Sequence, residues 1–157
     1  MSLETDIKQK EFKSEYNKAI VNLIYTFNWL DYQQKKFFKE YDLTQQQYNI
    51  LRILRGQYPQ PCTINLLRDR MLDKMCDASR IVERLRLKDL IVRKISFQDR
   101  RAVDIIISDK GLQILEQIDA PIKEFENTIT GLSVEEAEHL NALLDKFRNG
   151  KEYASGF

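Results

Sequence analysis

Ten polar side chains from Thr63 to Arg101 are the candidates for chemistry in this sequence. They are Thr63, Lys74, Asp77, Ser79, Arg80, Arg84, Lys88, Asp99, Arg100 and Arg101. Residues 52–101 hold 13 basic and 6 acidic side chains, a net charge of +7, whereas residues 1–51 have net charge 0 and residues 102–157 have −6. A basic excess this local is the electrostatic footprint of a surface that binds a polyanion such as DNA. The alternative is an ordinary solvated surface.

Residues 74–88 have the periodicity of an amphipathic helix. Met75, Ala78, Val82 and Leu85 recur at a spacing that places them on one helical face. The other face is polar and mostly basic, with Asp77, Ser79, Arg80, Glu83, Arg84 and Lys88. The major groove of DNA admits a helix and presents a distinct donor and acceptor pattern for each base pair. These residues therefore predict a helix that can read bases.

Two β-rich runs follow this helix. They span Leu90–Phe97 and Ala102–Ser108, and only residues 98–101 separate them. Such a pair of runs with a short polar connection is typical of a β-hairpin. The hairpin would carry Arg100 and Arg101 at its tip, beside the basic helix.

Four residues of the helix are the candidates for base recognition: Asp77, Ser79, Arg80 and Arg84. Arg80 is the first choice, because the forked guanidinium matches the O6 and N7 acceptors of guanine. The alternative for each arginine is a solvated charge or an intrachain ion pair.

Phosphate contacts and the hairpin tip complete the predicted interface. Phosphate contacts, which set the register of a protein on the duplex, are expected from Thr63, Lys74, Lys88 and Arg100. Arg101 is the candidate for insertion into the minor groove, where a narrow groove concentrates negative potential. Asp99 can accept a hydrogen bond from the Arg101 guanidinium and hold it in one orientation.

The sequence before the basic helix also predicts secondary structure. Residues 6–41 predict one long helix, whose apolar stripe of Tyr16, Ile20, Leu23 and Phe27 exceeds what a small core needs. The surplus favours packing against a partner subunit. The alternative is a core helix that merely extends.

A second helix is predicted to begin at a capping box formed by Thr44 and Gln47, and to end at Gly56. Thr63 can cap a short third helix that runs through about Met71. A short helix, a turn and the basic helix follow each other in the order of a helix-turn-helix.

After the hairpin, Ser108 can cap a further helix, which Pro121 is expected to end or kink. Ser133 and Glu136 form a second capping box before a last helix. Residues 151–157 are expected to be a tail.

The hairpin residues resemble those of the MarR family of bacterial transcriptional regulators. The run Asp99-Arg100-Arg101-Ala102-Val103, continued by Ser108 and by Lys110-Gly111, is similar to the wing signature of that family. Ser79-Arg80 is similar to its recognition-helix signature. The family usually has glycine before Leu90, where the helix ends in a left-handed turn, but here the residue is Asp89, which tolerates that conformation less well than glycine.

The resemblance implies a mainly α fold with a small β-hairpin wing, that is, a winged helix-turn-helix flanked by N- and C-terminal dimerisation helices. It divides the single structural domain into residues 1–42 (dimerisation helix), 43–108 (DNA-binding region), 109–150 (dimerisation helices) and 151–157 (tail). It also implies a homodimer, and the same pairing of Asp99 with Arg101.

The predicted function is that of a sequence-specific DNA-binding transcriptional regulator, a repressor, that binds a pseudopalindromic operator as a homodimer. The recognition helix would enter the major groove and the wing the minor groove. The alternative is a winged-helix protein-interaction module. An enzyme is not expected, because no nucleophile–base pair, paired carboxylates, glycine-rich phosphate loop or metal cluster is visible.

No cofactor is expected. The resemblance allows an unidentified small-molecule effector, whose pocket the aromatic residues Tyr16, Trp29, Tyr32 and Tyr48 could line. At helical spacing these side chains are more often core or dimer contacts.

The two cysteines, Cys62 and Cys76, and the single histidine, His139, have no metal-ligand spacing. They indicate a reduced, cytoplasmic protein. The longest uncharged run, residues 19–30, is shorter than the roughly 20 residues of a membrane span. A helix dipole could lower the pKa of Cys76, but a small packing residue is the favoured interpretation.

Overall fold

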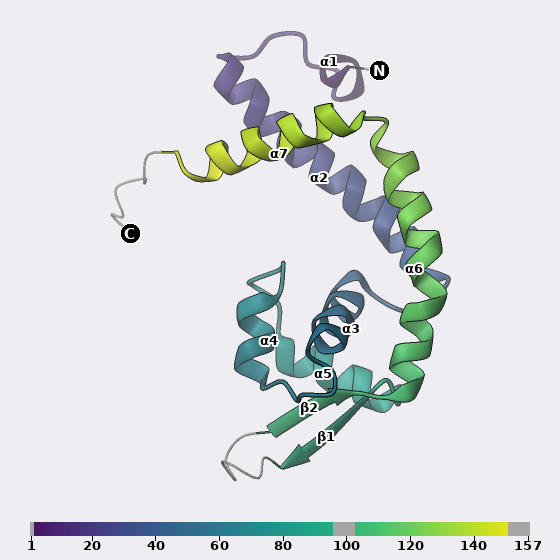
Figure 1. Cartoon of the computed structure of the whole chain (residues 1–157). Helices are drawn as coiled ribbons and strands as arrows, with labels where there is room; N and C mark the ends of the chain where they lie inside the picture. Colours follow the sequence, from purple (N-terminus) through teal and green to yellow (C-terminus); the bar gives the residue numbers. More distant parts are fainter. Residues whose placement is uncertain (1, 96–102, 151–157) are drawn as a thin grey trace. The chain divides into compact units, whose positions relative to one another are not determined.

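In a computed structural model of the chain, the structure describes residues 2–95 and 103–150 (Figure 1). The described elements are α1 (Leu3–Asp6), α2 (Glu15–Lys39), α3 (Gln45–Gln57), α4 (Ile64–Arg70), α5 (Ala78–Leu87), β1 (Ile91–Ile95), β2 (Val103–Ile107), α6 (Asp109–Thr130) and α7 (Val134–Arg148). They belong to two compact units, Met1–Leu115 and Glu116–Phe157, and α6 begins in the first unit and continues in the second. The predicted fold class, mainly α with a two-stranded hairpin, is confirmed.

The first long helix begins later than predicted. α2 starts at Glu15, because the side chain of Ser14 accepts a hydrogen bond from the backbone N–H of Asn17 at 3.1 Å and caps the helix. The preceding α1 is a separate short helix whose Glu4 forms an ion pair with Lys18 of α2. The Lys18 ammonium lowers the pKa of the Glu4 carboxyl to about 2. Between the two helices, Lys8 has a φ of 56°, a left-handed conformation that a continuous α-helix does not contain.

The capping box of α3 is confirmed. The Thr44 hydroxyl accepts from the Gln47 backbone N–H at 3.1 Å, and the Gln47 side chain accepts from the Thr44 backbone N–H at 3.1 Å. The prediction that Gly56 ends the helix is wrong. α3 continues through Gln57, and Tyr58 is its C-cap. Gly56 therefore lies inside the helix, where it needs no special backbone conformation.

The core of the first unit is built around α3. Its buried side chains come from α3, α4, α5 and the two strands, and include Ile50, Leu51, Leu54, Leu67, Val82, Leu85, Ile105 and Ile107. From α2, Phe38 is buried against Tyr48, with ring centroids 4.6 Å apart. This core fixes the positions of the short helices α4 and α5 and of the base of the hairpin.

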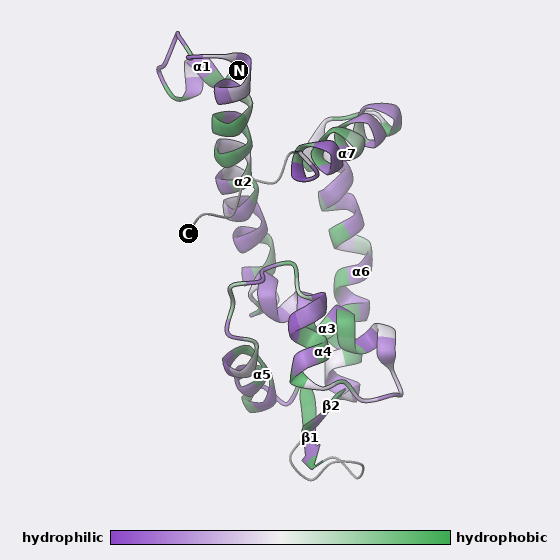
Figure 2. Cartoon of the chain, turned by 90° about the vertical axis from the view of Figure 1, so that its left-hand side faces the viewer, coloured by the Kyte–Doolittle hydropathy of each residue, from purple (hydrophilic) through white to green (hydrophobic). Residues whose placement is uncertain are grey.

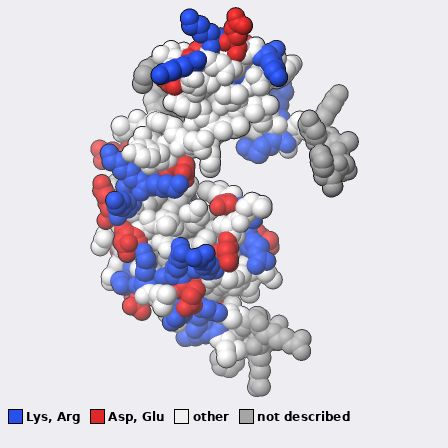
Figure 3. Space-filling view, turned by 180° about the vertical axis from the view of Figure 1, so that it is seen from behind, with Lys and Arg blue, Asp and Glu red and all other residues white. Residues whose placement is uncertain are grey.

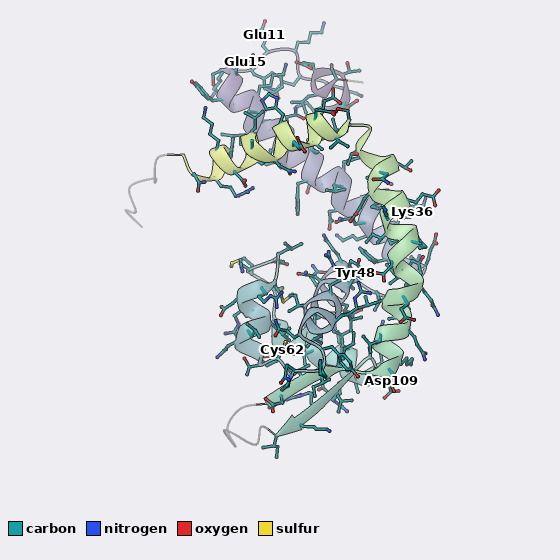
Figure 4. All side chains as sticks on the ribbon, viewed as in Figure 1. Glu11, Glu15, Lys36, Tyr48, Cys62 and Asp109 are labelled. Atoms are coloured by element: carbon teal, nitrogen blue, oxygen red, sulfur yellow. The ribbon has the colours of Figure 1, made fainter. Side chains whose placement is uncertain are left out.

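The hairpin has the predicted antiparallel pairing, in the register Ile91↔Ile107 to Ile95↔Val103. A third strand-like segment joins it, which the sequence did not indicate. Cys62 pairs with Ile105 through two backbone hydrogen bonds of 2.8 Å, so Cys62 is buried beside β2 (Figure 4). This pairing places Thr63, the cap of α4, next to the sheet.

Helix α5 ends in a left-handed turn at Asp89, where φ is 60°. The Leu90 N–H donates to the Leu85 carbonyl at 3.0 Å, and the Asp89 N–H donates to the Arg86 carbonyl at 3.0 Å. These two bonds are those of a Schellman motif. The turn expected from the resemblance is therefore formed, with aspartate in the position that favours glycine.

Asp89→Gly is expected to stabilise the protein by about 0.5–1 kcal/mol, because glycine has no Cβ to oppose the positive φ. The midpoint of thermal unfolding, measured at fixed protein concentration, should rise by roughly 1–4 °C. Asp89→Ala is the matched control and should lower the midpoint. A glycine variant less stable than the wild type would contradict this account of the turn.

The junction between β2 and α6 is tightly closed. The Ser108 hydroxyl accepts from the Gly111 N–H at 3.0 Å, as predicted for a cap, and donates to the Asp89 carbonyl at 2.7 Å. A Cβ at Gly111 would lie 2.3 Å from the Leu90 carbonyl oxygen and 2.7 Å from Cγ1 of Ile107. Glycine is therefore required at position 111, because Leu90, just after α5, and Ile107 lie too close to the start of α6 to leave room for a side chain.

In the second unit, Pro121 lies inside α6 and does not end it, so the helix tolerates the loss of one backbone hydrogen bond. Gly131, with φ of 60°, separates α6 from α7. The predicted capping box of α7 is confirmed: the Ser133 N–H donates to the Glu136 carboxylate at 2.8 Å and the Glu136 N–H donates to the Ser133 hydroxyl at 3.2 Å.

Both units expose apolar surface. In α2 only Phe38 is buried, and green apolar residues recur along the helix in Figure 2. Its predicted stripe is exposed, and Tyr16 is 86% accessible. In the second unit α7 has no buried residue, and it exposes Leu140, Leu143 and Phe147. Neither surface is covered within its own unit.

Candidate nucleic-acid interface

The predicted helix-turn-helix is formed by α4, residues 71–77 and α5. The Thr63 hydroxyl caps α4 by accepting from the Leu66 N–H at 3.2 Å, as predicted. Asn49 of α3 holds the turn, because its side-chain oxygen accepts from the Leu72 N–H at 3.0 Å. The prediction that Met75 belongs to the apolar face of the helix is wrong. Met75 precedes α5 and is 94% exposed.

Asp77 has a structural task that the sequence prediction did not give it. It is the N-cap of α5, and its carboxylate accepts a hydrogen bond from the Arg80 N–H at 3.0 Å. Aspartate is among the preferred N-cap residues, and its charge is favourable at the positive end of a helix. The Asp77 carboxylate is therefore already engaged at the start of α5.

The other three candidates for base recognition lie on the exposed side of α5. Ser79, Arg80 and Arg84 are exposed, while Ala78, Val82 and Leu85 face the core. Among the described residues, the guanidinium groups of Arg80 and Arg84 have no ion pair or hydrogen bond. α5 lies behind α3 and α4 in Figure 1, and the face seen from behind carries many Lys and Arg side chains with some acidic ones among them (Figure 3).

Both lysines predicted to contact phosphate donate to a backbone carbonyl of the protein, and Lys74 remains exposed. Lys74 donates to the Asp69 carbonyl at 2.5 Å. Lys88 donates to the backbone carbonyl of Asp42 and forms an ion pair with its carboxylate at 3.0 Å. Lys110 in turn donates to the Lys88 carbonyl at 2.9 Å. Lys88 thus ties the end of α5 to the turn between α2 and α3.

The wing-tip candidates Asp99, Arg100 and Arg101 lie outside the described residues, and so their roles stay predictions. The strands on either side bring Ile95 and Val103 into register as neighbours. The base of the hairpin is anchored in the core through Ile91, Ile105 and Ile107.

Glu83 has a position that the sequence prediction missed. Its carboxylate accepts from Arg86 of α5 through Nε at 3.0 Å and Nη2 at 2.7 Å, and from Nη1 of Arg93 of β1 at 3.0 Å. The hydrogen bond from Arg86, together with Arg93, lowers the pKa of the Glu83 carboxyl. The spacing of Glu83 and Arg86 is readable as a helical pair, whereas the contact with Arg93 depends on how the hairpin folds back.

The environment of Cys76 does not favour a reactive thiolate. Burial, and then the nearby Asp73 carboxylate, raise the pKa of its thiol. The thiol donates to the Asp73 carbonyl at 2.9 Å. The idea that the α5 dipole lowers this pKa is wrong, and the packing interpretation fits better. Burial also raises the pKa of Cys62.

Small hollows flank α3 in the first unit. One of about 390 Å³ is lined by Phe27, Asp31, Gln45, Gln46, Asn49, Met71, Leu72, Asp73 and Lys74. None of the four aromatic residues predicted to line an effector pocket is among them, and Tyr48 is instead buried in the core (Figure 4). The hollow is nevertheless bounded by the turn that precedes α5.

Within residues 2–95 and 103–150, no cluster of three or more histidine, cysteine or acidic side chains could hold a metal ion. In the same part of the chain, no helix combines the length and the apolar character that crossing a membrane requires.

Comparison with known proteins gives a consistent group of relatives. No model of a protein family matches the chain. The HTH-type transcriptional regulator MhqR of Bacillus subtilis is 25% identical over 138 residues, which cover 87% of this chain and 94% of the relative. The crystal structure of a MarR transcription factor from Planctomyces limnophilus is 26% identical, with a TM-score of 0.65 over 86% of this chain and 98% of that one.

Two further solved structures, each of a protein with a bound molecule, have the same fold. A mutant of MarR from E. coli, complexed with operator DNA, is 22% identical, with a TM-score of 0.71 over 94% of this chain and 99% of that one. The organohalide-sensing regulator RdhR-CbdbA1625, in a form bound to 2,4-dichlorophenol, is 20% identical, with a TM-score of 0.76 over 91% of this chain and 87% of that one.

Proposed function

We propose that the chain is a winged-helix protein of the MarR family and that it is a sequence-specific DNA-binding regulator of transcription. The observation that carries the proposal is the exposed face of α5, where Arg80 and Arg84 have no partner among the described residues. This face belongs to a helix-turn-helix followed directly by a hairpin, an arrangement suited to two grooves at once. The relatives are transcription factors, in agreement with the prediction that the chain is not an enzyme.

In the proposed complex, α5 enters the major groove, with Arg80 on a guanine and with Ser79 and Arg84 beside it. Thr63, at the start of α4, and Lys74, in the turn, contact phosphates. Asp77 and Lys88 receive a different task from the one predicted. Their charged groups bind α5 and the α2–α3 turn, so they position the helix instead of reading DNA.

The wing provides the remaining contacts of the proposed DNA complex. Arg101 enters the minor groove, Asp99 orients its guanidinium, and Arg100 contacts a phosphate. The basic charge of residues 52–101 supplies the attraction to the backbone, and the acidic residues of 102–157 are not part of the proposed interface.

The proposed active form is a homodimer. The first unit exposes the stripe of α2 and the second unit exposes the apolar side chains of α7, and exposed apolar side chains on one helix can mark an interface. A two-fold dimer binds a pseudopalindromic operator whose half-sites are about one helical turn, roughly 34–36 Å, apart. We assign it the role of a repressor.

A small-molecule effector is proposed to act through the hollow of about 390 Å³ between α2, α3 and the turn before α5. Asn49 lines this hollow and holds the backbone of Leu72 in the turn. A ligand that displaces this contact would move the start of α5, which would lower DNA affinity. The 2,4-dichlorophenol-bound relative supports an effector of this kind.

Selection of bound sequences from random duplex DNA tests the proposal. The expected result is one enriched pseudopalindrome with the half-site spacing given above. Enrichment of no sequence, by a protein that sediments as a folded dimer, would contradict it.

A further inference from the structure

We infer that Glu83 is a positioning residue that holds the wing at a fixed angle to the recognition helix α5. The inference rests on the proposed function, because the angle matters only if the helix and the wing bind the same DNA. It assigns to an acidic side chain on a basic surface a role that favours DNA binding.

The geometry places one carboxylate between two elements. Glu83 lies on α5 one turn before its end, and binds Arg86 with two parallel hydrogen bonds of 2.7 and 3.0 Å. Its Oε2 also accepts from Arg93 of β1 at 3.0 Å. Bonds between ionised partners, and two-pronged ones above all, restrict orientation more than a neutral contact does. The side chains are 41%, 45% and 38% accessible for Glu83, Arg86 and Arg93, so water still reaches all three.

The hairpin needs such a contact because its own anchoring is limited to its base. Ile91, Ile105 and Ile107 are buried, whereas β1 is exposed from Val92 onward. Isolated two-stranded hairpins are only marginally stable. Arg93 lies on the same side of β1 as Ile91, since side chains alternate along a strand. Its bond to Glu83 therefore extends the attachment of β1 to α5 by two residues toward the tip.

Electrostatics and positioning predict opposite effects when this charge is removed. Glu83 is a negative charge beside the proposed phosphate-binding surface, so electrostatics alone predicts that Glu83→Gln tightens DNA binding. Positioning predicts that the same variant weakens binding, because the wing is no longer held in its binding orientation. The sign of the change separates the two.

The test compares three full-length proteins: the wild type, Glu83→Gln, and the control Asp69→Asn. Asp69 is an exposed acid of α4 whose carboxylate forms no ion pair with the described residues, so its variant removes the same charge without breaking a contact. Two quantities are measured on each protein. One is amide hydrogen exchange of the free protein at fixed pH, and the other is affinity for the selected operator.

For Glu83→Gln, exchange is expected to quicken in residues 91–95 and 103–107 but not in α3, and operator affinity is expected to fall about tenfold. Asp69→Asn should show neither change. Unaltered exchange in the hairpin would overturn the inference whatever happens on DNA. Faster exchange with equal or tighter operator binding would show that the wing angle is not used, which also overturns it.

The proposed function fails by a different result. If the wild type binds no DNA, the regulator assignment falls, and with it the use of the wing angle, even where the exchange data show that Glu83 holds the hairpin.

Discussion

Gly111→Ala is expected to lower the free energy of unfolding by about 3 kcal/mol, which is the upper part of the usual range for overpacking. The added Cβ would lie 2.3 Å from the Leu90 carbonyl oxygen, a backbone atom that cannot rotate away. The Leu90 carbonyl also accepts a hydrogen bond from the Ser108 N–H at 3.1 Å, so moving it breaks a second contact. Urea unfolding at fixed protein concentration measures the change.

Gly56→Ala is the matched control. A Cβ there meets no atom within 4 Å, and alanine is the better helix former by about 0.5–1 kcal/mol. This variant should be as stable as the wild type or slightly more stable. Equal stability of the two alanine variants would contradict the close packing at the junction of β2 and α6.

The consequence for DNA binding follows from what meets at this junction. The end of α5, the end of β2 and the start of α6 are joined there through Ser108 and Leu90. A variant that loosens the junction should separate the recognition helix from the wing even where the rest of the unit stays folded. Operator affinity of Gly111→Ala should therefore fall below that of Gly56→Ala.

Arg80→Ala is expected to weaken operator binding by about 10- to 100-fold, the effect of losing one bidentate contact to guanine. It should also relax the preference at one base pair of each half-site. Stability should change little, because the Arg80 side chain is exposed and its backbone N–H keeps the bond to Asp77. Fluorescence anisotropy with the selected operator and with single-base variants measures both effects.

Two further variants separate base reading from charge. Lys74→Ala should weaken binding to all sequences alike and reduce the salt dependence by about one phosphate contact per subunit. Arg148→Ala removes an arginine of α7 that is paired with Asp145, and should leave binding unchanged. If Arg80→Ala binds the operator as tightly as the wild type, α5 does not read bases through this residue.

The parts of the fold that depend on neighbours in sequence were predictable. Both capping boxes and the Ser108 cap rest on residues three positions apart, and the hairpin pairs two segments that follow each other in the sequence. Such contacts are local, so the pattern of residue types carries them directly. The start of α2 is also local but was missed, because Ser14 is followed three positions later by Asn17 and not by the Glu or Gln of a capping box.

The contacts between distant segments could not be predicted. Lys88 and Asp42 are 46 positions apart, and Cys62 meets Ile105 across the whole helix-turn-helix. The periodicity of the sequence does not indicate which lysine forms an ion pair with a distant carboxylate. The prediction assigned Lys88 to a phosphate contact, and in the folded chain its ammonium binds Asp42 in the α2–α3 turn.

Gly56 and Gly111 show the same difference between what residue type predicts and what tertiary contacts decide. Gly56 was taken for a helix end from its residue type alone, and it lies inside α3. Gly111 was noted as part of a motif, but its physical reason is the approach of Leu90 and Ile107, which only the folded chain reveals. The candidate interface shows the same difference. Arg80 and Arg84 are exposed as predicted, whereas Asp77 caps α5.

The most direct test of DNA recognition is fluorescence anisotropy of the wild-type protein with its selected operator and with a scrambled duplex, at salt concentrations from 50 to 200 mM. With about six phosphates neutralised per dimer, affinity for the operator should fall about a thousandfold or more over this range. The scrambled duplex should bind far more weakly throughout. Equal binding of the two duplexes, or no binding at 50 mM by a folded dimer, would contradict sequence-specific regulation and favour a protein-interaction module.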